Sequence, residues 1–156
     1  MDRTSGSQGE TSSGRAPYDF LASRESFERF VGAWEAGTLP KPMWTHAAHV
    51  AVGACYTVRY SAQAFEKIKR GILRYNAAVG TENTEISGYH ETLTRFWSEV
   101  IADAVAGCND PWEAAQAAVR KFGDQRKLPE RYYSFDVVSD REARRRWIPP
   151  DRPGAK

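Results

Sequence analysis

Apolar residues recur every three or four positions along most of the chain, which is the spacing of one face of an α-helix. Between Phe27 and Trp34, for example, large apolar side chains keep this spacing until Gly37 ends the pattern. The segment after Thr45 is apolar on nearly every side, which indicates a helix buried in the core. The predicted helices span 24–36, 45–59, 61–79, 90–106 and 110–122, with a short helix capped by Ser139 and Glu142 near the C-terminus.

Residues that favour helix ends mark several of these boundaries. Thr45, Ser61 and Asp110 are predicted N-caps, because their side-chain oxygens can accept a hydrogen bond from a first-turn amide. Gly37 and Gly80 are predicted to end helices, because glycine adopts the left-handed conformation that closes a helix.

No alternating strand pattern longer than 132–138, no solenoid repeat and no glycine-rich phosphate loop occurs in the sequence. The predicted fold is therefore all-α, a single-domain bundle of five or six helices over residues 17–152. Residues 1–16 are rich in Ser, Gly and Thr, so we expect a disordered N-terminal tail. Residues 153–156 are expected to fray.

Composition narrows the classes of partner. The 156 residues include 22 basic and 20 acidic side chains, a balance that argues against nucleic acid and anionic membranes as partners. No segment approaches the roughly 20 apolar residues of a membrane-spanning helix. Cys55 and Cys108 lack CxxC spacing and are predicted to be buried thiols in a reducing cytoplasm. The partners that we consider are a small-molecule substrate or ligand and a second copy of the chain in a homodimer.

All three histidines of the chain lie in two short motifs. His46 and His49 belong to THAAH at 45–49, and His90 belongs to GYHET at 88–92. On a helix, positions 46 and 49 are about 60° apart and one turn apart, so both imidazoles project from one face. Gly53 lies on that face one turn later and leaves room beside it. If the helices that carry the two motifs pack together, three imidazoles can converge.

Three neutral imidazoles with one open position form the arrangement of a catalytic Zn²⁺ site, and imidazole also binds Fe. We therefore predict a small metal-dependent enzyme, a hydrolase or an oxygenase, that acts on a small molecule. The predicted ligands of its divalent transition metal, Zn or Fe, are His46, His49 and His90. Glu91 is the predicted general base or a residue that fixes an imidazole, and Tyr89 is a candidate proton donor.

Each assignment has an alternative. The histidines could line the pocket of a non-catalytic helical ligand-binding or interaction domain, or form hydrogen bonds within its core. Acid/base catalysis by a histidine and a glutamate without a metal is a third interpretation. Glu91 could pair with Arg95 four residues later on the helix, and Tyr89 could pack in the core.

Several further residues are candidates for the lining of a pocket around the histidines. They are Gly53, Tyr56, Asn76, Thr94, Tyr132 and Tyr133. Tyr132 and Tyr133 belong to an aromatic segment after Pro129, which could fold over the helix ends as a lid. Core packing is the alternative for both tyrosines, and a helix-end position is the alternative for Asn76.

Five segments together resemble a family of small bacterial proteins that has THxxH and GYHET motifs and no assigned reaction. They are WTHAAHVAVG at 44–53, NAAVG at 76–80, GYHETLTRFW at 88–97, LPERYYS at 128–134 and SDREARRRWIPPD at 139–151. The resemblance covers about residues 25–152. It implies that the family's motif positions are His46, His49, His90 and Glu91, with Tyr132, Tyr133 and Ser134 in its C-terminal motif.

Overall fold

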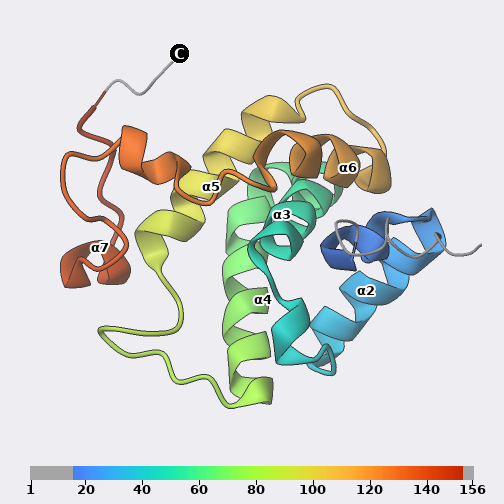
Figure 1. Cartoon of the computed structure of the whole chain (residues 1–156), viewed down its shortest axis with the longest axis horizontal. Coiled ribbons are helices and arrows are strands. Elements are labelled where there is room, and N and C mark those ends of the chain that lie inside the picture. The colour runs from blue at the N-terminus through green and yellow to red at the C-terminus, as the bar shows by residue number, and fades with distance from the viewer. Residues whose placement is uncertain (1–15, 153–156) are drawn as a thin grey trace, which may run out of the picture.

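The structure is a computed structural model that describes residues 16–152, and the fold of these residues is all-α (Figure 1). The α-helices are α2 (Arg24–Ala36), α3 (His46–Tyr60), α4 (Ala64–Val79), α5 (Glu91–Ala104), α6 (Pro111–Phe122) and the short α7 (Arg141–Arg145). Four 3-10 turns accompany them: η1 (Ala16–Leu21), η2 (Lys41–Met43), η3 (Ser61–Gln63) and η4 (Leu128–Arg131). The predicted all-α bundle is confirmed. Apart from Ala16, the predicted tail and the predicted frayed end lie outside the described residues.

Helix α3 lies at the centre of the bundle and contacts α4, α5 and α6 (Figure 1). Its residues are buried on almost every side, which explains why the sequence shows no polar face there. Alanines are frequent on both α3 and α6, and Ala48, Ala51, Ala114 and Ala118 are completely buried. Such small side chains allow the two helix backbones to approach closely.

Most of the predicted helix ends are confirmed. The Thr45 side chain accepts a hydrogen bond from the Ala48 amide at 3.2 Å, and the Asp110 side chain caps α6. Gly37 and Gly80 end α2 and α4 with φ values of 77° and 78°. These boundaries were predictable because each depends on residues that are neighbours in sequence.

Two predicted caps are wrong. Ser61 does not cap an α-helix: α3 continues to Tyr60, Ser61 with φ of 50° begins the 3-10 turn η3, and α4 begins at Ala64. Ser139 does not cap α7, because the side chain of the next residue, Asp140, accepts the hydrogen bond from the Glu142 amide at 3.1 Å. At Ser139 an equally suitable cap, Asp140, is the next residue, whereas α4 begins at Ala64 without any side-chain cap.

The segment 128–148 packs beside α5, from which α6 separates it in the sequence (Figure 1). It forms a second, smaller core in which Tyr133, Val137 and Ala143 surround Phe96 of α5. This segment therefore extends the bundle past α5 and supplies one wall of the site described below.

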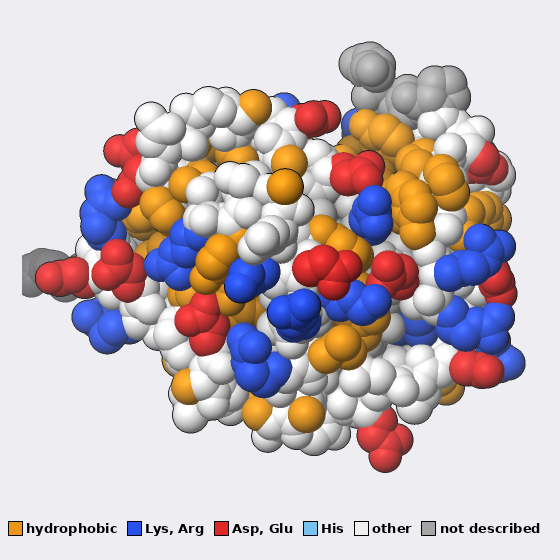
Figure 2. Space-filling view, turned by 180° about the vertical axis from the view of Figure 1, so that it is seen from behind, with side chains coloured by type: hydrophobic (Ala, Val, Ile, Leu, Met, Phe, Trp, Pro, Cys, Tyr) orange, Lys and Arg blue, Asp and Glu red, His pale blue; other side chains and the backbone are white. Residues whose placement is uncertain are grey.

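The surface of the described residues is mixed in charge. On the face in Figure 2, basic and acidic side chains are interleaved. The basic run in α7 is partly neutralised, because Arg145 and Arg146 both pair with Glu142. Within residues 16–152, every helix is too short or too polar to cross a membrane. Cys55 is a buried free thiol as predicted, whereas the free thiol of Cys108 is only half-buried.

Replacing Gly71 of α4 by alanine is expected to lower the free energy of unfolding by about 1–3 kcal/mol, as overpacking of a core does. A Cβ at this position would lie 2.4 Å from Cη2 of Trp34, which is completely buried and cannot move aside. Gly32→Ala in α2 is the matched control, because nothing lies within 4 Å of its added Cβ, and it should stabilise by about 0.5–1 kcal/mol. Urea unfolding of both variants checks this, and equal effects would contradict the close contact between Gly71 and Trp34.

Candidate functional site

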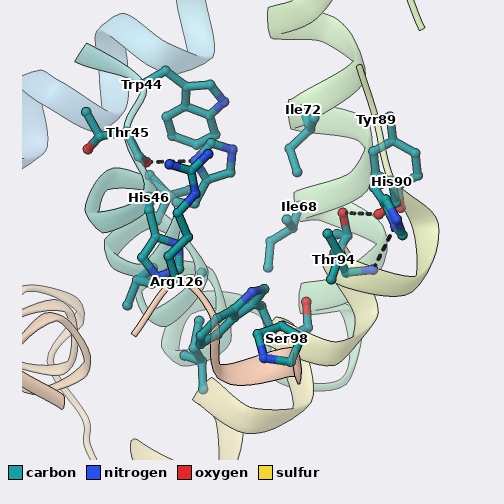
Figure 3. Close-up of a pocket in the computed structure, with 18 of the residues that line it drawn as sticks. Trp44, Thr45, His46, Ile68, Ile72, Tyr89, His90, Thr94, Ser98 and Arg126 are labelled. Carbon is teal, nitrogen blue, oxygen red and sulfur yellow. Dashed lines mark hydrogen bonds between the residues drawn. The ribbon is translucent and has the colours of Figure 1, made fainter. Parts of the chain in front are cut away.

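A cavity of about 570 Å³ opens between α3, α4, α5 and the C-terminal segment (Figure 3). This volume lies within the range of pockets that bind small molecules. The apolar part of its lining includes Trp34, Val50, Val52, Ile68, Ile72, Leu93, Trp97, Ile101, Pro129 and Val138. Its polar residues are Thr45, His46, His49, Tyr89, His90, Thr94, Ser98 and Arg126. All three histidines line the cavity, so the two histidine motifs meet at one site.

His46 is held by the end of α6. Its Nε2 lies 3.0 Å from the carbonyl oxygen of Phe122, and because a carbonyl can only accept, Nε2 carries the proton. Its ring contacts the edge of Trp97 at a centroid distance of 4.9 Å. Burial lowers the pKa of His46, and the positive charge of Arg126 adds to the decrease. His46 is therefore neutral near pH 7, with Nδ1 unprotonated.

His49 has the opposite tautomer. Its Nδ1 donates to the carbonyl oxygen of Thr45 at 2.7 Å, which leaves Nε2 as an acceptor. The ring stacks on Trp44 at a centroid distance of 3.9 Å. Protein atoms around the cavity desolvate the imidazole and lower its pKa. The side chain is nevertheless exposed to the cavity, so its free Nε2 can be reached by a ligand.

His90 is the N-cap of α5 and has no nitrogen left for a ligand. Its Nδ1 accepts a hydrogen bond from the Leu93 amide at 3.1 Å. Its Nε2 donates to the carbonyl oxygen of Val137 at 2.9 Å. The side chain is buried, and this burial lowers its pKa. Binding a metal through His90 would break one of these two bonds, so its geometry favours a structural role.

The three imidazoles share a cavity without forming a metal-binding group. Within residues 16–152, no group of three or more His, Cys, Asp or Glu side chains could hold a metal ion. The physical reason lies in the backbone: three different carbonyls hold the three rings, and only His46 and His49 keep an unused lone pair.

Glu91 and Tyr89 form a pair with each other. The Tyr89 hydroxyl donates to Glu91 Oε1 at 2.8 Å, and Lys69 Nζ of α4 lies 3.1 Å from the same oxygen. Glu91 does not line the cavity and does not pair with Arg95, which pairs instead with Glu99. Tyr89 lines the cavity, but burial and the hydrogen bond to Glu91 raise its pKa. The predicted base is therefore occupied by an ion pair, and the predicted proton donor points its proton at that base.

Two of the six pocket candidates line the cavity. A Cβ at Gly53 would lie 3.2 Å from Cδ1 of Ile101, so the glycine leaves only limited extra space. Thr94 lines the opposite wall, where its hydroxyl donates to the carbonyl oxygen of His90 at 2.7 Å. These two residues lie on the helices that carry the histidine motifs, which is why helical periodicity could place them.

The other four candidates lie elsewhere. The Tyr56 hydroxyl donates to Glu35, and the Asn76 amide donates to Asn83 Oδ1 at 3.0 Å. Tyr132 packs against the edge of Phe96, and the Tyr133 hydroxyl donates to the carbonyl oxygen of Ile148 at 2.7 Å. The two tyrosines therefore belong to the smaller core of the C-terminal segment and do not form a lid.

Sequence reasoning missed Arg126, Trp44 and Ser98 as lining residues. Arg126 lies in the loop after α6, where no periodic pattern indicates a direction for its side chain. Trp44 directly precedes the first motif, and this adjacency was the one available signal. Ser98 lies two helical turns after His90, on the face that Thr94 shares, so an extension of the same periodicity could have found it.

The second motif attaches the C-terminal segment to the bundle. Besides the bond from His90 to Val137, the Thr92 hydroxyl donates to the carbonyl oxygen of Arg146 at 2.7 Å and accepts from the Ile148 amide at 3.0 Å. The Arg144 guanidinium donates to the carbonyl oxygen of Gly88 at 2.8 Å. Since this segment supplies Val138 to the cavity, the motif shapes the site by holding its wall.

Acid is expected to destabilise the protein through its histidines. All three pKa values are lowered in the folded state, whereas unfolded histidines bind protons below about pH 6.5. The unfolded state then binds more protons, so the free energy of unfolding should fall as pH decreases from about 6.5. Urea unfolding between pH 7.5 and 5.5 checks this, with the double variant H46Q/H49Q expected to show a smaller decline. An identical decline in both proteins would contradict the neutral histidines described above.

Comparison of the chain with protein-family models, with curated proteins and with solved structures found no match. The family resemblance of the motifs therefore stays an expectation.

Proposed function

We propose that the chain binds a small organic molecule in the cavity. The apolar body of this ligand lies inside the cavity, and a hydrogen-bond donor of the ligand binds to a histidine nitrogen. The observation that carries this proposal is the combination of a cavity of about 570 Å³ with two imidazoles whose tautomers are fixed by the backbone. Pockets for small molecules typically combine a mainly apolar lining with a few fixed polar groups.

The apolar part of the cavity suits a hydrocarbon or aromatic body. In Figure 3, Ile68 and Ile72 of α4 project from one side of the open space toward His46 on the other. Trp97 and Leu93 of α5 add further apolar surface. Burying apolar surface contributes about 25 cal/mol per Å², so even a two-ring ligand gains several kcal/mol before the costs of binding are subtracted.

The polar part selects for a donor. Because His46 donates through Nε2 and His49 through Nδ1, their other nitrogens can only accept hydrogen bonds while the rings are neutral. A hydroxyl or N–H group on the ligand fits such an acceptor, whereas an ether or ketone oxygen does not. A ligand hydrogen bond of this kind contributes about 0.5–1.5 kcal/mol, or about twofold to tenfold in affinity.

Calorimetric titration with two matched probes tests the proposal. We expect 2-naphthol to bind, and to bind several-fold tighter than 2-methoxynaphthalene, which lacks the donor. The variant His49→Leu should reduce this preference, because it removes the better exposed acceptor and replaces it by an apolar side chain that cannot accept a hydrogen bond. Failure of both probes to bind would contradict the proposed function, and a preference that survives in both H49L and H46L would contradict the role of the histidines.

A metal-dependent reaction is the second candidate function. It is favoured by one observation, the two lone pairs that His46 and His49 keep while both residues line the same cavity. Elemental analysis of protein purified without a histidine tag tests it. Stoichiometric Zn or Fe that is lost in H46A/H49A but kept in His90→Asn would favour this candidate. Absence of bound metal after incubation with Zn²⁺ and Fe²⁺ would contradict it.

A further inference from the structure

A second hollow lies beside the cavity, at the surface around η4. We call it the basic groove; it has a volume of about 620 Å³ and is lined by Asp124, Gln125, Arg126, Lys127, Leu128, Glu130, Arg131 and Arg152. Arg126 lines both the groove and the cavity. The two hollows therefore adjoin at this one side chain.

The groove carries more positive than negative charge. Four of its side chains are cationic and two are carboxylates. Within residues 16–152, none of the four cationic side chains forms an ion pair, and Arg126, Lys127 and Arg131 make no side-chain hydrogen bond. Elsewhere on the surface, basic residues such as Lys69 and Arg141 do pair with a carboxylate. The positive charge of the groove is therefore open to a partner.

The Arg126 side chain connects this charge to the cavity. In Figure 3 it extends toward the start of α3, where Trp44 and His46 lie. Its charge contributes to the lowered pKa values of both His46 and His49, which agrees with this placement. A ligand whose apolar body fills the cavity would thus meet a guanidinium at the opening and further cations beyond it.

We propose that the ligand is an amphipathic phosphate ester, with its apolar body in the cavity and its phosphate on Arg126 in the basic groove. This inference rests on the proposed function and names the class of its ligand. A phosphate dianion matches several neighbouring cations, and the planar guanidinium of Arg126 can donate two parallel hydrogen bonds to its oxygens. Lys127 and Arg131 are exposed and supply additional charge.

Titration calorimetry with 2-methoxynaphthalene, 2-naphthyl phosphate and inorganic phosphate at low ionic strength tests the inference. The quantity to compare is the ratio of the dissociation constants of 2-methoxynaphthalene and 2-naphthyl phosphate in each protein, because neither probe carries the naphthol hydroxyl and the ratio therefore reports the phosphate alone. A charge-assisted hydrogen bond contributes about 1.5–3 kcal/mol, so we expect a ratio of at least about tenfold in the wild type. In Arg126→Gln the ratio should fall below about threefold. Inorganic phosphate alone should bind more weakly than 2-naphthyl phosphate.

Arg120→Gln is the matched control, because it removes an equal charge from an exposed position on α6 that lines neither hollow. It should keep the wild-type ratio, and an equal loss in both variants would overturn the assignment to Arg126. Binding of 2-methoxynaphthalene as tight as that of 2-naphthyl phosphate would overturn this inference and leave the proposed function standing. Failure of both naphthyl probes to bind would overturn both.

Discussion

Replacing His90 by alanine is expected to lower the free energy of unfolding by about 2–3 kcal/mol. The loss of an N-cap costs about 0.5–2 kcal/mol, and the loss of the bond to the Val137 carbonyl adds about 1 kcal/mol. The buried carbonyl of Val137 would then lack its partner, which weakens the attachment of the C-terminal segment. Urea unfolding measures the total effect, and limited trypsin digestion should show faster cleavage within 128–148.

His90→Asn separates the two roles of this histidine. The asparagine oxygen can accept the hydrogen bond from the Leu93 amide, but its shorter side chain does not reach Val137. We therefore expect a loss of about half that of the alanine variant, with faster cleavage of the C-terminal segment in both. Equal stability of H90A and the wild type would show that His90 is neither the cap nor the attachment point described here.

Ser98→Phe is expected to weaken the binding of 2-naphthol by about tenfold or more, because it places an aromatic ring in the cavity. Ser98 lines the cavity from α5, and its hydroxyl points into the open space in Figure 3. Within residues 16–152 this hydroxyl makes no hydrogen bond, so its loss leaves no partner unsatisfied there. A tenfold loss of affinity corresponds to about 1.4 kcal/mol. This is a fraction of the free energy that the ligand would gain by burying its apolar surface.

The control for this variant is Ser98→Ala, which removes the hydroxyl and adds no volume. It should bind 2-naphthol within about twofold of the wild type, and calorimetry of the three proteins side by side checks both expectations. Thermal unfolding of S98F should remain cooperative, since the new ring fills empty space. Unchanged affinity in a folded S98F protein would contradict binding in the cavity.

The fold could be predicted well because its signals are local. Apolar spacing and the terminal glycine predict a helix over 24–36, which agrees with α2 to the residue. The start of α6 followed from Asp110 and Pro111 in the same way. The Ser139 cap was wrong because the next residue, Asp140, is an equally good cap. The Ser61 cap was wrong because the chain forms a 3-10 turn there and α4 then begins without a side-chain cap.

The site was predictable only in part. Periodicity placed His46 and His49 on one face, and the cavity does bring the two histidine motifs together. The role of His90 was not predictable, since its partner Val137 lies 47 residues away. The sequence favours two roles for Glu91, a base beside the neighbouring His90 or an ion pair with Arg95 four residues later. Its ion pair is instead with Lys69 on another helix. Local patterns place side chains on faces but do not choose their long-range partners.

The most direct test of the account is the protonation of the imidazoles, observed in a long-range ¹H–¹⁵N NMR spectrum at pH 7 with and without 2-naphthol. We predict three neutral rings, with the proton on Nδ1 of His49 and on Nε2 of His46 and His90. Adding 2-naphthol should shift the unprotonated nitrogen of His49 or His46 and leave both nitrogens of His90 unchanged. A protonated His49, or a spectrum in which only His90 responds, would contradict the account.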